Sequence, residues 1–146
     1  MNKIYIFFGL FLLTSWAPNE VPSKNLVERD GIKYEVNSQT PFTGIGMIYH
    51  ENGQLSQKGN YKDGKRVGLF EFYHENGQLK AMGIWKDGKR EGLYVSFYEN
   101  GQLLGKGNFK DGEFDGLWEI YHENGQLKAK PCYRIGEDVD ISYCEK

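Results

Sequence analysis

Cysteine, proline and histidine are scarce in this sequence, and neither sign of charge dominates. Two cysteines in 146 residues are too few for a disulfide-dense scaffold or a four-cysteine zinc site. Twenty acidic residues against eighteen basic ones give a net charge of −2, which disfavours nucleic acid as the main partner. Glycine and aromatic residues are abundant instead, with nineteen glycines and an aromatic share of 15%. This balance is typical of short strands joined by tight turns.

The N-terminal segment differs in character from the rest of the chain. A basic start that ends at Lys3 precedes an apolar run from Ile4 to Leu13, and small residues follow up to Ala17. This is the three-part pattern of a secretory signal, and the run is shorter than the roughly 20 residues of a membrane-spanning helix. We therefore predict a signal peptide over residues 1–17 and export to the periplasm, the cell envelope or the medium. The alternative is a buried strand or a short interfacial helix.

Residues 18–40 are expected to form a linker and an irregular lead-in. Pro18, Pro22 and scattered charges argue against early packing of this segment. The dipeptide Asp30-Gly31 lies between two short apolar stretches, so it predicts one weak hairpin within the lead-in.

One tetrapeptide recurs four times at a fixed interval. Asn-Gly-Gln-Leu begins at Asn52, Asn76, Asn100 and Asn124, so each copy follows the last by 24 residues. Lys-Asp-Gly recurs with the same step, and a fixed period of this length indicates a repeat architecture. Both Asn-Gly and Asp-Gly favour two-residue type I′ turns. The predicted fold is all-β, an array of antiparallel β-hairpins that forms one elongated, twisted meander sheet over residues 41–131.

Two-residue turns would fix the register of every strand pair. They place Phe70 opposite Gly83, His74 opposite Leu79, and Gly83 opposite Gly92. Large rings would then cover glycines on one face of the sheet. That face is also expected to carry a leucine row and an aromatic row, which are Leu55, Leu79, Leu103 and Leu127, and Tyr61, Trp85 and Phe109. The opposite face is expected to be wetter.

The repeated units resemble a known family. Tyr-His-Glu-Asn-Gly-Gln-Leu, Lys-Asp-Gly-Lys and Gly-Leu-aromatic-Glu are similar to the bacterial MORN-repeat variant, and the resemblance covers about residues 40–130. It implies a β-hairpin array that binds proteins or lies near membranes. Members that resemble this chain are commonly labelled antitoxins of toxin–antitoxin systems, which implies a toxin as one kind of partner. An exported chain would instead suit an immunity-like role in the envelope.

Candidate catalytic and metal-binding groups are few. His50, His74 and His122 occupy one repeat position, so neighbouring copies should lie about 10 Å apart. Ligands of one metal ion must lie within about 4 Å of each other, so these histidines are expected to flank turns and pack on leucines. The segment around Lys106 lacks the Ser or Thr and the helix of a phosphate-binding loop. The sequence therefore predicts no enzyme activity, no metal and no cofactor.

Two surfaces are candidates for binding a partner. An aromatic row on the wetter face is expected to be partly exposed and to bind a protein, because aromatic side chains give large contact areas; its residues are Tyr49, Tyr73, Phe97 and Tyr121. A basic edge at the Asp-Gly turns is expected to contact anionic headgroups weakly or to remain solvated; its residues are Lys62, Lys65, Arg66, Lys86, Lys89 and Arg90.

The remaining feature is the pair Cys132 and Cys144 in the C-terminal segment. A hairpin over residues 132–146 would bring the two cysteines face to face and cap the array, and a disulfide there would contribute about 3 kcal/mol. The alternative is two free thiols. We predict an exported, non-catalytic module that acts by binding another protein, which is either a toxin or an envelope protein. The alternatives are an envelope- or membrane-associated structural module that uses the basic edge, and a cytoplasmic antitoxin.

Overall fold

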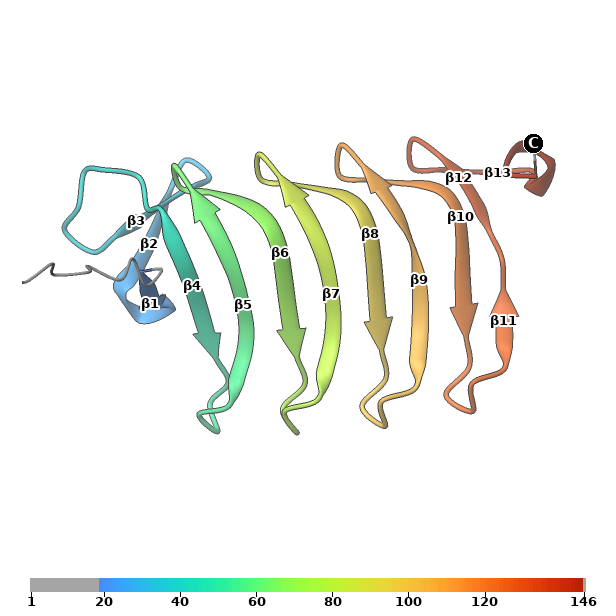
Figure 1. The fold of residues 1–146 in the computed structure, drawn as a ribbon, viewed down its shortest axis with the longest axis horizontal. Coiled ribbons are helices and arrows are strands. Elements are labelled where there is room, and N and C mark those ends of the chain that lie inside the picture. The colour runs from blue at the N-terminus through green and yellow to red at the C-terminus, as the bar shows by residue number, and fades with distance from the viewer. Residues whose placement is uncertain (1–18, 146) are drawn as a thin grey trace, which may run out of the picture.

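The structure is a computed structural model that describes residues 19–145, and the predicted signal peptide over residues 1–17 lies outside that range. Most of the described chain forms one antiparallel meander in which each strand pairs with the next (Figure 1). The all-β hairpin array expected from the 24-residue period is therefore confirmed. Its strands are β4 (Gly44–Tyr49), β5 (Leu55–Lys62), β6 (Lys65–Tyr73), β7 (Leu79–Lys86), β8 (Lys89–Phe97), β9 (Leu103–Lys110) and β10 (Glu113–Tyr121).

The N-terminal lead-in is more ordered than the sequence indicates. Strand β1 (Glu20–Pro22) pairs in parallel with β4, and a single 3-10 turn, η1 (Ser23–Asn25), follows it. Strands β2 (Leu26–Arg29) and β3 (Ile32–Glu35) form the expected hairpin. Val21 and Phe42 explain the added order, because both are buried in one cluster with side chains of the first repeats.

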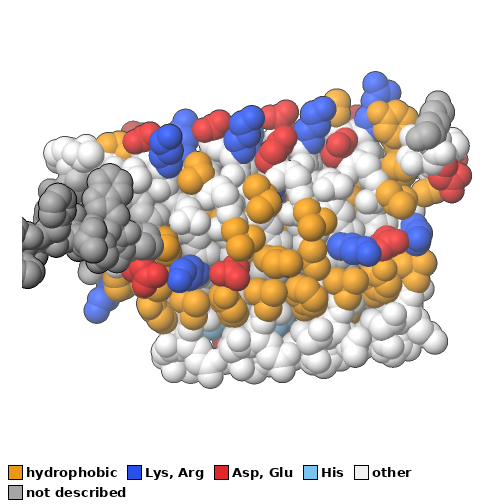
Figure 2. All heavy atoms as spheres, in the orientation of Figure 1, with side chains coloured by type: hydrophobic (Ala, Val, Ile, Leu, Met, Phe, Trp, Pro, Cys, Tyr) orange, Lys and Arg blue, Asp and Glu red, His pale blue; other side chains and the backbone are white. Residues whose placement is uncertain are grey.

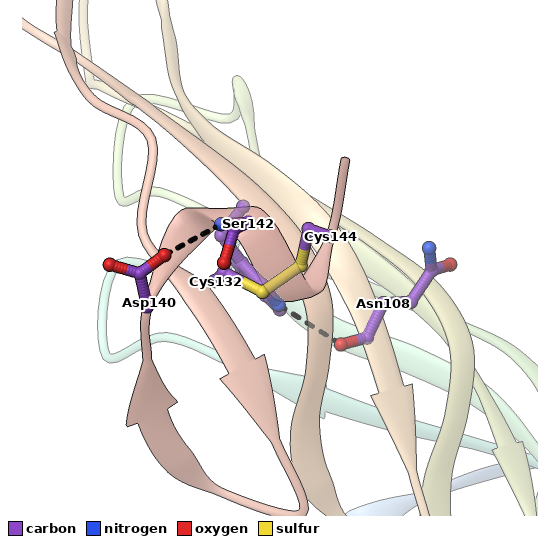
Figure 3. The surroundings of a disulfide bond; sticks show 6 residues. Asn108, Cys132, Asp140, Ser142 and Cys144 are labelled. Atoms are coloured by element: carbon purple, nitrogen blue, oxygen red, sulfur yellow. Dashed lines mark hydrogen bonds between the residues drawn. A yellow bond between two sulfur atoms is a disulfide. The ribbon is translucent and has the colours of Figure 1, made fainter. Parts of the chain in front are cut away.

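The C-terminal segment closes the other end of the array. Strand β10 pairs with β11 (Leu127–Ala129) and then with β12 (Cys132–Arg134), which forms a hairpin with β13 (Glu137–Val139). A 3-10 turn, η2 (Ile141–Tyr143), follows, and a disulfide joins Cys132 to Cys144 with their Cα atoms 6.1 Å apart (Figure 3). Cys132 lies opposite Val139 in the hairpin rather than opposite Cys144, so the disulfide ties η2 back onto β12.

The two kinds of turn differ in conformation. At the Asp-Gly turns both central residues have positive φ, for example 49° at Asp87 and 88° at Gly88, as a type I′ turn requires. The prediction of type I′ at the Asn-Gly turns is wrong, because only the glycine has positive φ there. The Gly77 amide donates to the His74 carbonyl at 2.9 Å, and the His74 amide donates to the Gln78 carbonyl at 2.8 Å. These bonds define a three-residue loop, which is a type I turn followed by a left-handed glycine.

A bulge after each Asn-Gly turn changes which face the leucines occupy. Tyr73 pairs with Leu79, whereas the next pair is Phe72 with Ala81, so Lys80 has no partner. The bulge offsets the extra turn residue, and the predicted pairing of Phe70 with Gly83 is confirmed. The predicted pairing of His74 with Leu79 is wrong. Because paired residues point to the same face, the leucine row lies on the face of Tyr73 and not on the face of the buried rings.

A second bulge follows each Asp-Gly turn. Trp85 pairs with Arg90, but Gly83 pairs with Tyr94, so the predicted pairing of Gly83 with Gly92 is also wrong. The rings of this face lie directly over glycines of neighbouring strands, and a Cβ atom on Gly107 would lie 2.2 Å from the Trp118 ring. We call this side of the sheet the aromatic face; its central rings are Tyr61, Phe70, Trp85, Tyr94, Phe109 and Trp118. All of these except the partly buried Tyr94 are buried, so the core of the array lies on this face.

Candidate functional site

The other side of the sheet, which we call the exposed face, carries a continuous row of hydrophobic side chains. The row follows the strand ends next to the Asn-Gly turns, and it runs along the lower part of the face in Figure 2. Each turn contributes one aromatic residue and the leucine that pairs with it across the hairpin. We call this row the apolar band; its pairs are Tyr49–Leu55, Tyr73–Leu79, Phe97–Leu103 and Tyr121–Leu127.

The band is open to solvent along its length. Tyr49 and Leu127 at its two ends are 45% and 48% exposed, and the six residues between them are partly buried. The described lead-in packs on the aromatic face, where Val21 and Phe42 are buried and Leu26 lies against them. The four aromatic residues singled out from the sequence therefore lie together, and the structure adds four leucines to them.

The centre of the exposed face is also apolar. One row of cross-strand partners on this face runs through β5 to β10; its residues are Lys58, Glu71, Met82, Val95, Lys106 and Glu119. The row is charged on β5, β6, β9 and β10 and hydrophobic on β7 and β8. Three exposed side chains adjoin this pair of hydrophobic residues, and they are Leu69, Ile84 and Leu93. We call these five residues the central patch. The sequence signal for it was the loss of charge at Met82 and Val95, which the repeat analysis did not use.

Paired charges flank the central patch on both sides (Figure 2). On the β5 side, the Lys58 Nζ lies 3.3 Å from Glu20 Oε1. On the β10 side, the Glu119 carboxylate lies 2.9 Å from both Lys106 and Lys130 and accepts a hydrogen bond of 2.8 Å from the Tyr121 hydroxyl. These three donors lower the pKa of Glu119 to about 2. An apolar centre with a polar rim is the usual composition of a protein-binding surface.

The histidines hold neighbouring repeats together through the backbone of the apolar band. His50 Nε2 donates to the Tyr73 carbonyl at 2.9 Å, and His74 Nε2 donates to the Phe97 carbonyl at 3.0 Å. Tyr98 replaces histidine in the third repeat, and its hydroxyl donates to the Tyr121 carbonyl at 2.9 Å. His50, His74 and Tyr98 therefore each tie one repeat to the next by a hydrogen bond. Among the described residues, no group of three His, Cys, Asp or Glu side chains has a metal-binding arrangement.

The six residues of the predicted basic edge separate into two groups. The lysines form cross-strand pairs at the turns, Lys62 with Lys65 and Lys86 with Lys89, and exposed aspartates lie beside them at each turn tip. The arginines belong to the aromatic face instead. The guanidinium of Arg66 lies 5.1 Å from the centre of the Phe70 ring, and that of Arg90 lies 5.0 Å from the centre of the Phe109 ring. The edge is therefore of mixed sign.

Comparison with known proteins identifies the repeat. A family model described as MORN repeat variant matches four segments that together make up more than half of the chain, and these are residues 42–63, 66–87, 90–111 and 114–134. Each segment spans most of one 24-residue period: the first begins just before β4, and each of the other three begins in the strand that follows an Asp-Gly turn. No curated protein matches the chain.

Proposed function

The chain belongs to the MORN repeat variant family, and from this premise we propose that it is a non-catalytic module that binds a protein through its exposed face. MORN repeats typically serve as protein- or membrane-binding modules and are generally non-catalytic. The observation that carries the proposal is the solvent-open apolar surface made by the apolar band and the central patch. A folded chain gains nothing from leaving so many apolar side chains in water, and such surfaces mark interaction sites.

The position of the charges supports a protein partner. The ion pairs of Lys58 and Glu119 lie on opposite sides of the apolar centre, where they would form the polar rim of an interface. Rim charges of both signs guide the orientation of a partner more than they add affinity. The proposal therefore assigns the affinity to the aromatic and leucine side chains and the orientation to the flanking ion pairs.

Contact with an anionic membrane has weaker support. The lysines of the Asp-Gly edge alternate with aspartates, and electrostatic attraction to anionic lipids needs a cluster of basic residues. Within residues 19–145, no helix is long and apolar enough to cross a bilayer. Export is a further part of the proposal and rests on the sequence of residues 1–17. An antitoxin- or immunity-like role is a narrower form of it and rests on family resemblance alone.

The test replaces two residues at the middle of the apolar band. The double variant Tyr73→Ser/Phe97→Ser is compared with the natural chain in affinity purification from the native host, followed by binding assays with each purified partner. Aromatic residues central to an interface contribute about 2–4 kcal/mol each, so binding should weaken by at least about 30-fold. The fold should survive, because the backbone carbonyls of both residues still accept their inter-repeat bonds.

The matched control is Lys62→Ser, which changes an exposed side chain at the Asp-Gly end of β5, outside the apolar band and the central patch. This control should bind as the natural chain does, and circular dichroism should be the same for all three proteins. Partner binding that persists in the double variant with an intact spectrum would overturn the proposal. Binding to anionic vesicles that disappears at about 0.5 M salt, with no protein partner, would favour the membrane alternative instead.

A further inference from the structure

The third repeat lacks a large side chain on the aromatic face. Ser96 of β8 occupies the position that Ile48, Phe72 and Ile120 occupy in the other repeats. Its cross-strand partner is Gly105. The other repeats have larger residues at this position, namely Gln57, Ala81 and Ala129. Both members of this pair are small only here, so the aromatic face has a gap between β8 and β9.

The gap forms a hollow of about 330 Å³. Ser96 and Gly105 line it together with the rings of Tyr94, Phe109 and Trp118. Leu104, which is 37% exposed, also lines it, at a repeat position where the second and fourth repeats have lysine. A further hollow of about 280 Å³ shares Tyr94, Ser96 and Leu104 with the first. The volume lies at the lower end of the range for small-molecule sites, and the lining is apolar in the way of such sites.

Arg90 supplies a positive charge to this hollow. Its guanidinium lies 5.3 Å from the centre of the Tyr94 ring and 5.7 Å from that of Trp85, so three rings including Phe109 fix its position. Within residues 19–145, no salt bridge includes Arg90. A positioned guanidinium without a carboxylate partner is available to bind an anion.

We propose that this hollow binds a small amphipathic anion, whose flat apolar body fills the space above Ser96 and Gly105 and whose anionic group contacts Arg90. The apolar body takes the place that a large side chain fills in the other repeats. The anionic group completes the charge balance that the chain itself leaves open at Arg90. The site lies on the face opposite the apolar band, so it does not depend on the protein-binding proposal.

The test uses two fluorescent probes with similar fused-ring bodies. 8-Anilino-1-naphthalenesulfonate is anionic, and N-phenyl-1-naphthylamine is neutral. The proposal predicts saturable binding of the anionic probe with one site per chain and weaker binding of the neutral probe. Ser96→Phe restores the side chain of the preceding repeat and should weaken both probes by about tenfold or more, because it fills the hollow. Ser96→Ala keeps the hollow open and should leave both affinities within about twofold.

The arginine is tested separately. Arg90→Gln should weaken the anionic probe by about tenfold and leave the neutral probe within about twofold, because only the charge-assisted contact is lost. Arg66→Gln is the matched control, since Arg66 holds the same repeat position, lies over the rings of Phe70 and Trp85, and does not line the hollow. Two results would overturn the proposal: probe binding that Ser96→Phe leaves unchanged, or equal losses in Arg90→Gln and Arg66→Gln. Tyr73→Ser, at a residue of the apolar band that lines neither hollow, should retain probe binding, which separates this site from the exposed face.

Discussion

Close contact between glycines and rings is the packing feature that a single methyl group tests most directly. A Cβ atom on Gly107 would lie 2.2, 2.3 and 2.5 Å from three atoms of the Trp118 ring. Carbon atoms in favourable contact are about 3.5–4.0 Å apart, so the ring must move by more than 1 Å. Trp118 is 6% exposed and packs on Phe109 and Phe114 with ring centres 5.2 and 4.7 Å apart. The two phenylalanine rings therefore resist this movement, although Trp118 also borders the hollow of about 330 Å³ at Ser96.

We expect Gly107→Ala to lower the free energy of unfolding by about 3 kcal/mol. Overpacking alone costs about 1–3 kcal/mol, and displacement of a buried tryptophan adds part of the 3–5 kcal/mol that its removal would cost. Thermal unfolding followed by circular dichroism should then show a midpoint lower by roughly 10 °C. Gly105→Ala is the control on the same strand and face, because the equivalent residue of the second repeat is already Ala81. It should change the midpoint little.

A double-mutant cycle identifies the cause of the loss. In the background of Trp118→Ala, the methyl group of Gly107→Ala has no ring to meet, so its added cost should fall below about 1 kcal/mol. A Gly107→Ala protein that unfolds at the natural midpoint would refute the argument that rings lie directly over glycines. Equal costs of Gly107→Ala with and without the Trp118 ring would refute it as well.

The remaining predictions concern the turns and the ion pairs. Ile135 is a β-branched residue with a φ of 50°, it is 71% exposed, and the first three repeats have aspartate at its position. Because asparagine adopts this conformation more readily, Ile135→Asn should raise the free energy of unfolding, measured by urea denaturation, by about 1 kcal/mol. Asn76→Ala removes two hydrogen bonds, one of 3.0 Å to the Glu99 carbonyl and one from the Gln78 amide. Asn124→Ala removes only the bond within its own turn, so Asn76→Ala should destabilise the fold by about 1 kcal/mol more. The Glu119 carboxyl should titrate near pH 2 by NMR and return toward its ordinary value of 4.5 in Lys106→Met. Because its pKa is lowered by folding, its contribution to stability is present above about pH 4.5 and is lost as the pH falls toward 2.

Several features of the exposed face were accessible from the sequence. The 24-residue step groups Tyr49, Tyr73, Phe97 and Tyr121 without any coordinates, because equivalent residues of a regular array must share a face. Their leucine partners were assigned to the wrong face. A single bulge residue after each Asn-Gly turn reverses the side on which the leucines lie, and a strand pattern of period two has no marker for such a bulge.

The conformation of the Asn-Gly turns shows the same limit at the scale of one residue. Asn-Gly is compatible with a two-residue type I′ turn and with a three-residue loop that ends in a left-handed glycine. The choice is made within each turn, because the asparagine side chain accepts the amide two residues on, as Asn76 does from Gln78 and Asn124 does from Gln126. The Asn124 turn has the same conformation without a bond to a following repeat, so the bond from Asn76 to the Glu99 carbonyl adds to this loop and does not select it.

The repeat, the all-β meander and the positions of the hairpins could be read from the sequence, because they follow from local turn preferences repeated at one interval. Which residues share a surface is a property of the packed array. The bulges at Lys80 and Gly92, the place of Arg90 over three rings and the hollow at Ser96 all depend on contacts between strands of different repeats. Such contacts form only when the hairpins pack side by side, since hydrogen bonding and ring packing between strands select one register from several that are locally equivalent.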